Sequence, residues 1–177
     1  MNVVFIEQSR NLVLKIRLFM KTQIVFIDTE FTQFDDPKLI SIGLAASSGE
    51  QFYAEVPYPL DECSEFVRKT VLPLLNKIEE YPYDSLNAII TNWLGLIKID
   101  SVVTLCYDSQ FDKYLFLKIF NESTPSFVQF RLLSRCEIIE LLHHEFYRIN
   151  RLPRHHALND ALALRNAYRE IPTRQVR

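Results

Sequence analysis

The stretch Val25-Phe26-Ile27-Asp28-Thr29-Glu30-Phe31 joins an uncharged apolar run to two carboxylates that are one residue apart. A short apolar run of this kind predicts a buried β-strand. Because side chains alternate along a strand, Asp28 and Glu30 would leave its end on the same side. Two buried carboxylates so close together repel each other, and burying them without a cation costs several kcal/mol. A divalent metal ion is therefore the simplest partner for this pair, although an isolated Asp-x-Glu more often marks a strand end that meets solvent.

The composition is that of one globular domain. The chain has 177 residues, of which 48% are hydrophobic and 24% charged, and only three are glycines. These values are typical of a soluble protein that buries one substantial core. The formal charge of −2 predicts no strong general attraction to nucleic acid. A phosphate-binding surface would therefore be local or would include metal.

The cysteines and the first residues bear on the compartment. Cys63, Cys106 and Cys136 are odd in number and widely spaced, which favours reduced thiols in a cytoplasmic protein over a disulfide framework or a zinc site. Residues 1–19 are apolar, but charged residues interrupt them. This arrangement of apolar and charged residues fits neither a membrane span nor a signal peptide. We expect an N-terminal extension over residues 1–19, whose order the sequence does not define, and a single domain over residues 20–177.

Hydrophobic periodicity predicts an α/β fold with a mixed sheet. The expected strands cover residues 25–31, 38–46, 51–56, 101–107 and 127–130, and a Ser/Gly turn between the second and third favours a hairpin. Five helices are expected. The first runs from a cap at Asp61 to Leu75, the second from Asp84 or Ser85 to Ile97, and the fourth over residues 138–147. The third begins near Ser109 and the fifth at His155-His156. Strands first, then alternating helices and strands, predict a mixed central sheet flanked by helices.

Two more acids and a histidine stand where chemistry is expected. Asp112 would lie in the first turns of a helix that follows a strand, at the sheet edge where open α/β sheets bind ligands. Asp160 lies among apolar neighbours on the last helix. His155 precedes Asp160 by five residues, which is about 140° around a helix, so it must belong to the preceding loop or cap. Such a mobile position suits a general base that approaches only with substrate.

Asp28, Glu30, Asp112 and Asp160 offer the oxygen ligands that hard divalent ions prefer. Carboxylates that hold two ions about 4 Å apart are the usual solution for phosphodiester cleavage. One ion activates a water molecule and the other stabilises the leaving oxygen. A neutral His155 near physiological pH would accept the proton of that water.

Three motifs resemble those of the DEDD exonucleases of the histidine type, the superfamily that includes RNase T, oligoribonuclease and polymerase proofreading domains. They are Phe26-Ile27-Asp28-Thr29-Glu30-Phe31, Phe111-Asp112-Lys113-Tyr114-Leu115 and His155-His156-Ala157-Leu158-Asn159-Asp160-Ala161. Their order and approximate separation also agree, over about residues 24–170. The chain length, Ile40-Ser41-Ile42-Gly43 and Val71-Leu72-Pro73 most resemble the small bacterial and phage exoribonucleases typified by a mycobacterial member.

The resemblance implies an RNase H-like fold and two Mg²⁺ or Mn²⁺ ions held by the four acids, with His155 as the base. It implies 3′-to-5′ hydrolysis that releases nucleoside 5′-monophosphates. The implied partner is a nucleic acid with a free 3′ end, and in the members that the chain resembles most this nucleic acid is RNA. The resemblance also implies no membrane partner and often a homodimer. Candidate substrate-binding residues are Thr29, Phe31 and Arg154. Phe31 could instead serve core packing, and Arg154 could belong to a solvated loop.

Two residue assignments and two classes of function stay open. Asp108 also ends a strand and competes with Asp112 as the ligand of the second motif. His156 stands four residues before Asp160, the spacing of the tyrosine-type variant, and competes with His155. A DNA exonuclease would carry the same motifs, because nothing in them reads a 2′-hydroxyl. A non-catalytic nucleic-acid-binding module would be expected to lack ligands, and none is missing.

Overall fold

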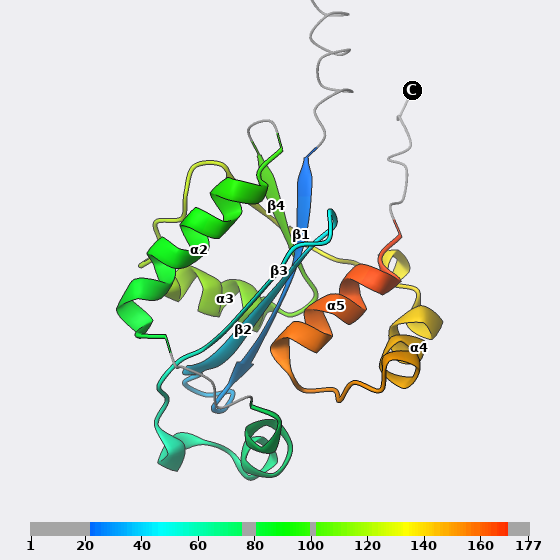
Figure 1. Ribbon diagram of the computed structural model, residues 1–177. Helices are drawn as coiled ribbons and strands as arrows, with labels where there is room; N and C mark the ends of the chain where they lie inside the picture. Colours follow the sequence, from blue (N-terminus) through cyan, green and yellow to red (C-terminus); the bar gives the residue numbers. More distant parts are fainter. Residues whose placement is uncertain (1–21, 76–80, 100–101, 170–177) are drawn as a thin grey trace, which may run out of the picture.

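The computed structural model describes residues 22–75, 81–99 and 102–169. The N-terminal extension expected over residues 1–19 lies outside these residues. Within them the chain forms one mixed sheet with the strand order β3-β2-β1-β4-β5 (Figure 1). The strands are β1 (Gln23–Phe31), β2 (Leu39–Ala46), β3 (Gln51–Glu55), β4 (Val103–Tyr107) and β5 (Val128–Leu132). The first three are antiparallel, whereas β4 and β5 run parallel to β1.

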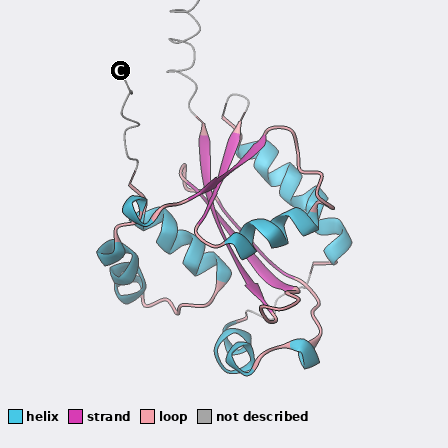
Figure 2. Cartoon of the chain, turned by 180° about the vertical axis from the view of Figure 1, so that it is seen from behind, coloured by secondary structure: helices cyan, strands magenta, loops and turns pink. Residues whose placement is uncertain are grey.

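Helices cover both faces of the sheet (Figures 1 and 2), with α2 and α3 on one face and α5, backed by α4, on the other. Their bounds are α2 (Tyr83–Ile97), α3 (Gln110–Ile119), α4 (Glu140–Asn150) and α5 (Ala157–Ala167). Four short turns join these elements: η1 (Leu60–Glu62), the π-helical η2 (Val67–Val71), η3 (Leu72–Leu74) and η4 (Arg135–Glu137), as far as the described residues extend. The α/β class and the flanked mixed sheet predicted from periodicity are confirmed.

The central strand β1 is buried from both sides, and its alternation sorts its side chains between the two helical layers. Val25 and Ile27 belong to the large core cluster that includes residues of α2 and α3. Phe26 belongs to a second cluster with Leu164 of α5. Because residues two apart share a face of a strand, Asp28 and Glu30 leave β1 on the same side as Phe26, toward α5.

β1 also extends beyond its neighbour β4. It pairs with β2 from Val25 to Phe31, but with β4 only from Gln23 to Phe26. The chain leaves β4 after Tyr107 and enters α3, whose N-cap Ser109 accepts a hydrogen bond from a backbone N–H of the first turn. The last residues of β1 therefore have β2 on one side and the start of α3 on the other.

A glycine in β2 lets the start of α5 approach the sheet closely. A Cβ atom at Gly43 would lie 2.4 Å from the carbonyl carbon of Ala157 and 2.4 Å from the backbone nitrogen of Leu158. No side chain fits into that space without moving backbone. The first turn of α5 therefore lies directly on β2, close to where Asp28 pairs with Gly43 across the two strands.

The helix predicted from a cap at Asp61 to Leu75 is confirmed only in part. Residues 65–74 form an unbroken helical stretch, which is π-helical over η2 and 3₁₀-helical over η3, and residues 63–64 separate it from the turn η1. The side chain of Arg68 donates hydrogen bonds to the carbonyls of Leu60, Asp61 and Cys63, which satisfies a bend between the turns. The backbone N–H of Ser64 donates to a carbonyl of the β1–β2 connection, at Thr32. These bonds fix the connection between η1 and η2, and no local sequence pattern reveals them.

All three cysteines are free thiols, as their number and spacing predict. Cys63 and Cys106 are buried, and Cys136 is exposed. Across residues 22–75, 81–99 and 102–169, no helix combines the length and the apolar character that crossing a membrane requires.

Candidate active site

The four predicted ligands come together beyond the end of β4, where β1, α3 and α5 meet. Asp28 and Glu30 stand on β1, Asp112 in the first turn of α3, and Asp160 in the first turn of α5. Their side chains form two adjoining groups, each with ligand atoms within 4.8 Å of one another. One group is Asp28, Asp108 and Asp112, and the other is Glu30, His155 and Asp160. Segments more than a hundred residues apart in sequence thus build one acidic site.

In the first group, Asp108 and Asp112 both face Asp28. The sequence presents them as competitors for one position, but the structure places a carboxylate oxygen of each within 4.8 Å of Asp28. Asp108 is the first residue after β4 and is more exposed than Asp112, which is buried. Asp112 is therefore the inner member of the pair and Asp108 the outer one.

Asp112 is held in place by β1. Its Oδ1 atom accepts hydrogen bonds from the backbone N–H of Thr29 at 3.0 Å and from the Thr29 hydroxyl at 2.7 Å. Its Oδ2 atom is buried and has no hydrogen-bond partner among the described residues. A buried carboxylate oxygen without a partner is costly. A divalent cation fits this atom, because it would satisfy the oxygen and neutralise the charge.

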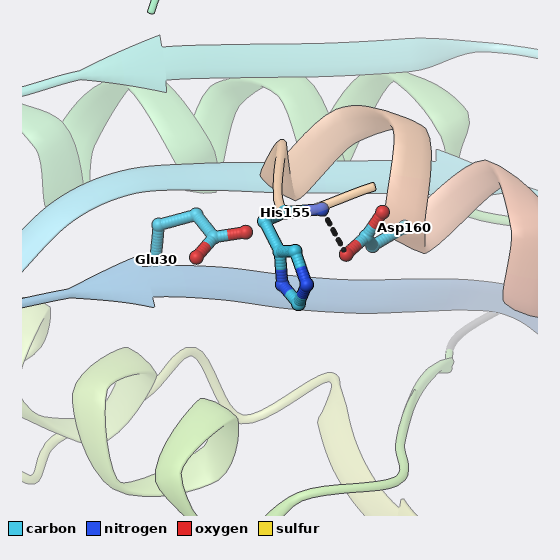
Figure 3. A group of neighbouring side chains, drawn as sticks. All are labelled: Glu30, His155 and Asp160. Atoms are coloured by element: carbon cyan, nitrogen blue, oxygen red, sulfur yellow. Dashed lines mark hydrogen bonds between the residues drawn. The ribbon is translucent and has the colours of Figure 1, made fainter. Parts of the chain in front are cut away.

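In the second group, His155 lies between Glu30 and Asp160 (Figure 3). It precedes α5 and has a left-handed backbone with φ of 62°. Its backbone N–H donates to Asp160 Oδ2 at 3.0 Å, so the loop and the helix hold each other. The residue is exposed, and its ring packs edge-on against Phe66, with 5.1 Å between ring centroids. The position ahead of the helix predicted for His155 is confirmed.

The neighbouring His156 is directed elsewhere. It is the N-cap residue of α5 and is buried, and its ring stacks on Tyr53 with 4.5 Å between centroids and an interplanar angle of 18°. It belongs to neither acidic group. Of the two adjacent histidines, His155 is the one whose side chain lies beside the acids.

Tyr147 of α4 completes the surroundings of Asp160, and the sequence does not point to it. Its buried hydroxyl donates to Asp160 Oδ1 at 3.1 Å. Both Asp160 oxygens therefore accept a hydrogen bond, one from Tyr147 and one from His155. No local signal could have identified the tyrosine, because its partner lies on another helix.

Burial and mutual repulsion raise the pKa values of the carboxyl groups. Burial, and then repulsion from Asp112 and Asp160, raises the pKa of Asp28 well above its ordinary value. Burial followed by the charges of Asp160 and Asp112 raises the pKa of Glu30 to about 8. Burial raises the pKa of Asp112 to about 7, although the Thr29 hydrogen bonds oppose the shift. Burial likewise raises the pKa values of Asp160 and Asp108.

These shifts describe a site that disfavours several negative charges on its own. Proton uptake relieves the repulsion, and so would a cation. Apart from the His155 imidazole, the donor atoms in the two groups are carboxylate oxygens, which suit Mg²⁺ or Mn²⁺ better than soft metals. The residues present therefore fit hard divalent ions.

The three predicted substrate-binding residues have different surroundings. Thr29 is buried, and its hydroxyl donates its one hydrogen bond to Asp112, so only its acceptor lone pairs remain for the predicted substrate contact. Phe31 is half-buried and stacks on Phe111, with 5.1 Å between centroids. Arg154 is exposed, and its guanidinium lies 4.9 Å from the centre of the Tyr147 ring. It therefore stands beside the Asp160 side of the site.

No protein-family model matches this chain, and a search of curated proteins found no match. The function is therefore inferred from the geometry and chemistry of the site and from the three motifs.

Proposed function

We propose that this protein is a 3′-to-5′ exoribonuclease that hydrolyses phosphodiester bonds with two Mg²⁺ or Mn²⁺ ions and releases nucleoside 5′-monophosphates. The observation that carries the proposal is the convergence of Asp28, Glu30, Asp112 and Asp160 beside His155. Each of these residues lies in one of the three motifs that resemble the histidine-type DEDD exonucleases. The acids come from distant segments and meet in two adjoining groups, and one group contains the buried Asp112 Oδ2 atom, which has no partner among the described residues.

The architecture supports the same proposal. A mixed sheet with β1 at its centre, β2 and β3 antiparallel to it and β4 and β5 parallel to it is compatible with an RNase H-like fold. The acids stand at the end of the central strand and at the first turns of two helices. In open α/β sheets this edge is the usual ligand site.

Each residue has a role in the proposed reaction. The four acids would hold the ions, with Thr29 orienting Asp112 and Tyr147 orienting Asp160. Two bound divalent ions supply charge neutralisation and a lowered pKa for water. His155 is an exposed residue on the loop before α5, so a ring nitrogen can accept a proton from the attacking water and return it to solvent.

The direction of attack and the choice of RNA come from the motif resemblance. No residue in the site is identified as reading a 2′-hydroxyl, so a matched DNA strand is the necessary comparison. A protein that degrades only the DNA strand would be a DNA exonuclease of the same fold. Binding without turnover in the presence of either ion would instead indicate a non-catalytic module.

The test uses 5′-labelled RNA and DNA single strands of the same sequence, each with Mg²⁺, with Mn²⁺ and with a chelator. We expect stepwise shortening of the RNA from its 3′ end and release of nucleoside 5′-monophosphates, both abolished by the chelator. Asp28→Ala and Asp160→Ala should reduce the rate to background, whereas Asp61→Ala, which changes an exposed acid outside both acidic groups, should keep it. An undiminished rate in Asp28→Ala would contradict the proposal.

A further inference from the structure

An aromatic surface begins beside the acids and continues along α3. Phe31 directly follows Glu30, and Phe111 directly precedes Asp112. The rings of Phe31 and Phe111 stack, and Phe34 packs edge-on against both at 5.4 and 5.3 Å between centroids. Phe34 is nonetheless 72% exposed. The three rings therefore form a contiguous apolar patch that is partly exposed, and such patches mark ligand-binding grooves or other interaction sites.

Two adjoining hollows follow this surface. The first has a volume of about 370 Å³, with Phe34, Phe111 and Tyr114 in its wall. The second has a volume of about 380 Å³, with Tyr83, Tyr114 and Lys118 in its wall. Tyr114 lines both, so the hollows form one groove. Phe111, Tyr114 and Lys118 are spaced by three and four residues, which places them on one face of α3.

The charges differ between the two hollows. Asp35 is the charged residue in the lining of the first, which suits a base better than a phosphate. In the second, Asp36 is paired with Lys38 at 2.7 Å, and Lys118 adds a further positive charge. The Lys118 ammonium lies 5.3 Å from the centre of the Tyr114 ring. An aromatic face with a cation beside it is the combination that binds a base together with its backbone phosphate.

We propose that this groove binds two successive nucleotides of a single strand on the 5′ side of the scissile phosphate. The strand direction rests on the proposed function: an enzyme that removes one nucleotide from a 3′ end has only that nucleotide beyond the scissile bond. A groove with room for two must therefore hold the upstream strand. Unpaired bases stack against Phe34, Phe111 and Tyr114, and Lys118 contacts a phosphate.

Turnover is compared on two kinds of substrate. One is a series from di- to hexanucleotide, and the other is the p-nitrophenyl ester of thymidine 5′-monophosphate, which has no upstream nucleotide. For Tyr114→Ala and for Lys118→Ala we expect the ratio of kcat/KM on the tetranucleotide to kcat/KM on the ester to fall about tenfold. The rise of kcat/KM with oligonucleotide length should flatten at the same time.

Lys113→Ala is the matched control. Lys113 lies on the same helix and, like Lys118, sits over an aromatic ring, but that ring is Phe130 of β5, at 5.5 Å. It lines neither hollow, so its substitution should leave the ratio at the wild-type value. Tyr114→Phe, which keeps the stacking ring, should retain the length dependence.

Binding is measured separately, by fluorescence anisotropy of a labelled hexanucleotide with Ca²⁺ in place of Mg²⁺. Both alanine variants should weaken binding, and Lys118→Ala should reduce the slope of log Kd against log salt by about 0.7, as for one lost phosphate contact on a single strand. A wild-type ratio and wild-type binding in both variants would overturn the groove while leaving the nuclease intact. If the wild-type protein cleaves neither substrate, the proposed function fails, and the anisotropy of the variants alone decides whether the groove binds the strand.

Discussion

The Asp112 carboxylate occupies the position of a missing strand partner for Thr29. Thr29 lies beyond Phe26, the last residue of β1 that pairs with β4. Its backbone N–H, which a longer β4 would satisfy, donates instead to Asp112 Oδ1 at 3.0 Å, and its hydroxyl donates to the same oxygen at 2.7 Å. The first turn of α3 is thereby fixed to the central strand through a side chain of the candidate active site.

Thr29→Val tests this connection, because valine keeps the shape and loses the hydroxyl donor. One buried hydrogen bond to a carboxylate is lost, so we expect the free energy of unfolding to fall by about 1–2 kcal/mol. With Asp112 less restrained, the Kd for Mn²⁺ measured by calorimetry should rise several-fold. Thr29→Ser keeps the donor and serves as the control. An unchanged Kd in Thr29→Val would show that the hydroxyl does not orient the ligand.

The raised pKa values predict that the metal-free protein loses stability as the pH rises. A carboxyl group whose pKa is higher in the folded state than in the unfolded state stabilises the fold while it is protonated, and this contribution disappears as pH passes its folded pKa. For Asp112 this contribution is lost between about pH 4 and about pH 7. For Glu30 it is lost between about pH 4 and about pH 8. Thermal unfolding in a chelator should therefore show a Tm that declines from pH 6 to pH 8.5. Saturating Mg²⁺ should reduce the decline, and a Tm that rises over this range in the chelator would contradict the repulsive site.

Asp28→Asn should separate stability from metal binding. Asp28 faces the repulsion of four other carboxylates, so removing its charge relieves that repulsion in the metal-free protein. At pH 8 in a chelator we expect its Tm to equal or exceed that of the wild type. The increase in Tm on addition of Mn²⁺ should be lost together with nuclease activity. A variant that unfolds several degrees earlier than the wild type in the chelator would show that Asp28 has a structural role instead.

Two glycine substitutions should have opposite effects. Gly43→Ala inserts a methyl group 2.4 Å from the backbone of Ala157, so either β2 or the start of α5 must shift. We expect a loss of about 1–3 kcal/mol in unfolding free energy and a lower kcat, since Asp160 moves with α5. Gly95→Ala in α2 has open space around the new methyl group and should stabilise the protein by about 1 kcal/mol through helix propensity. Chemical denaturation of both variants, followed by nuclease assays, measures this contrast.

The sequence predicts the candidate site correctly where a feature depends on residues close together in the chain. The alternation of β1 predicts that Asp28 and Glu30 share a face, and Ser109 predicts the start of α3, at which Asp112 lies in the first turn. The five-residue interval between His155 and Asp160 predicts a histidine outside the helix. Each of these features depends only on the side-chain periodicity of a single strand or helix.

The rest depends on contacts between elements. The helix predicted from Asp61 begins only at residue 65, and Arg68 binds carbonyls of the segment before it, which apolar spacing does not reveal. In the sequence, Asp108 and Asp112 are alternatives for the one ligand that the second motif supplies. In the structure, the turn between β4 and α3 brings both carboxylates close to Asp28. Tyr147 reaches Asp160 only because α4 packs against α5.

The position of α5 in the chain order has a consequence for synthesis. Of the described elements it is the last, and it supplies Asp160 with His155 directly ahead of it. Until this helix has been synthesised, the chain contains the acids of β1 and α3 but lacks the fourth carboxylate and the imidazole. A chain that ends before α5 would therefore lack the proposed hydrolysis, because the site would keep the acids of β1 and α3 without Asp160 and His155.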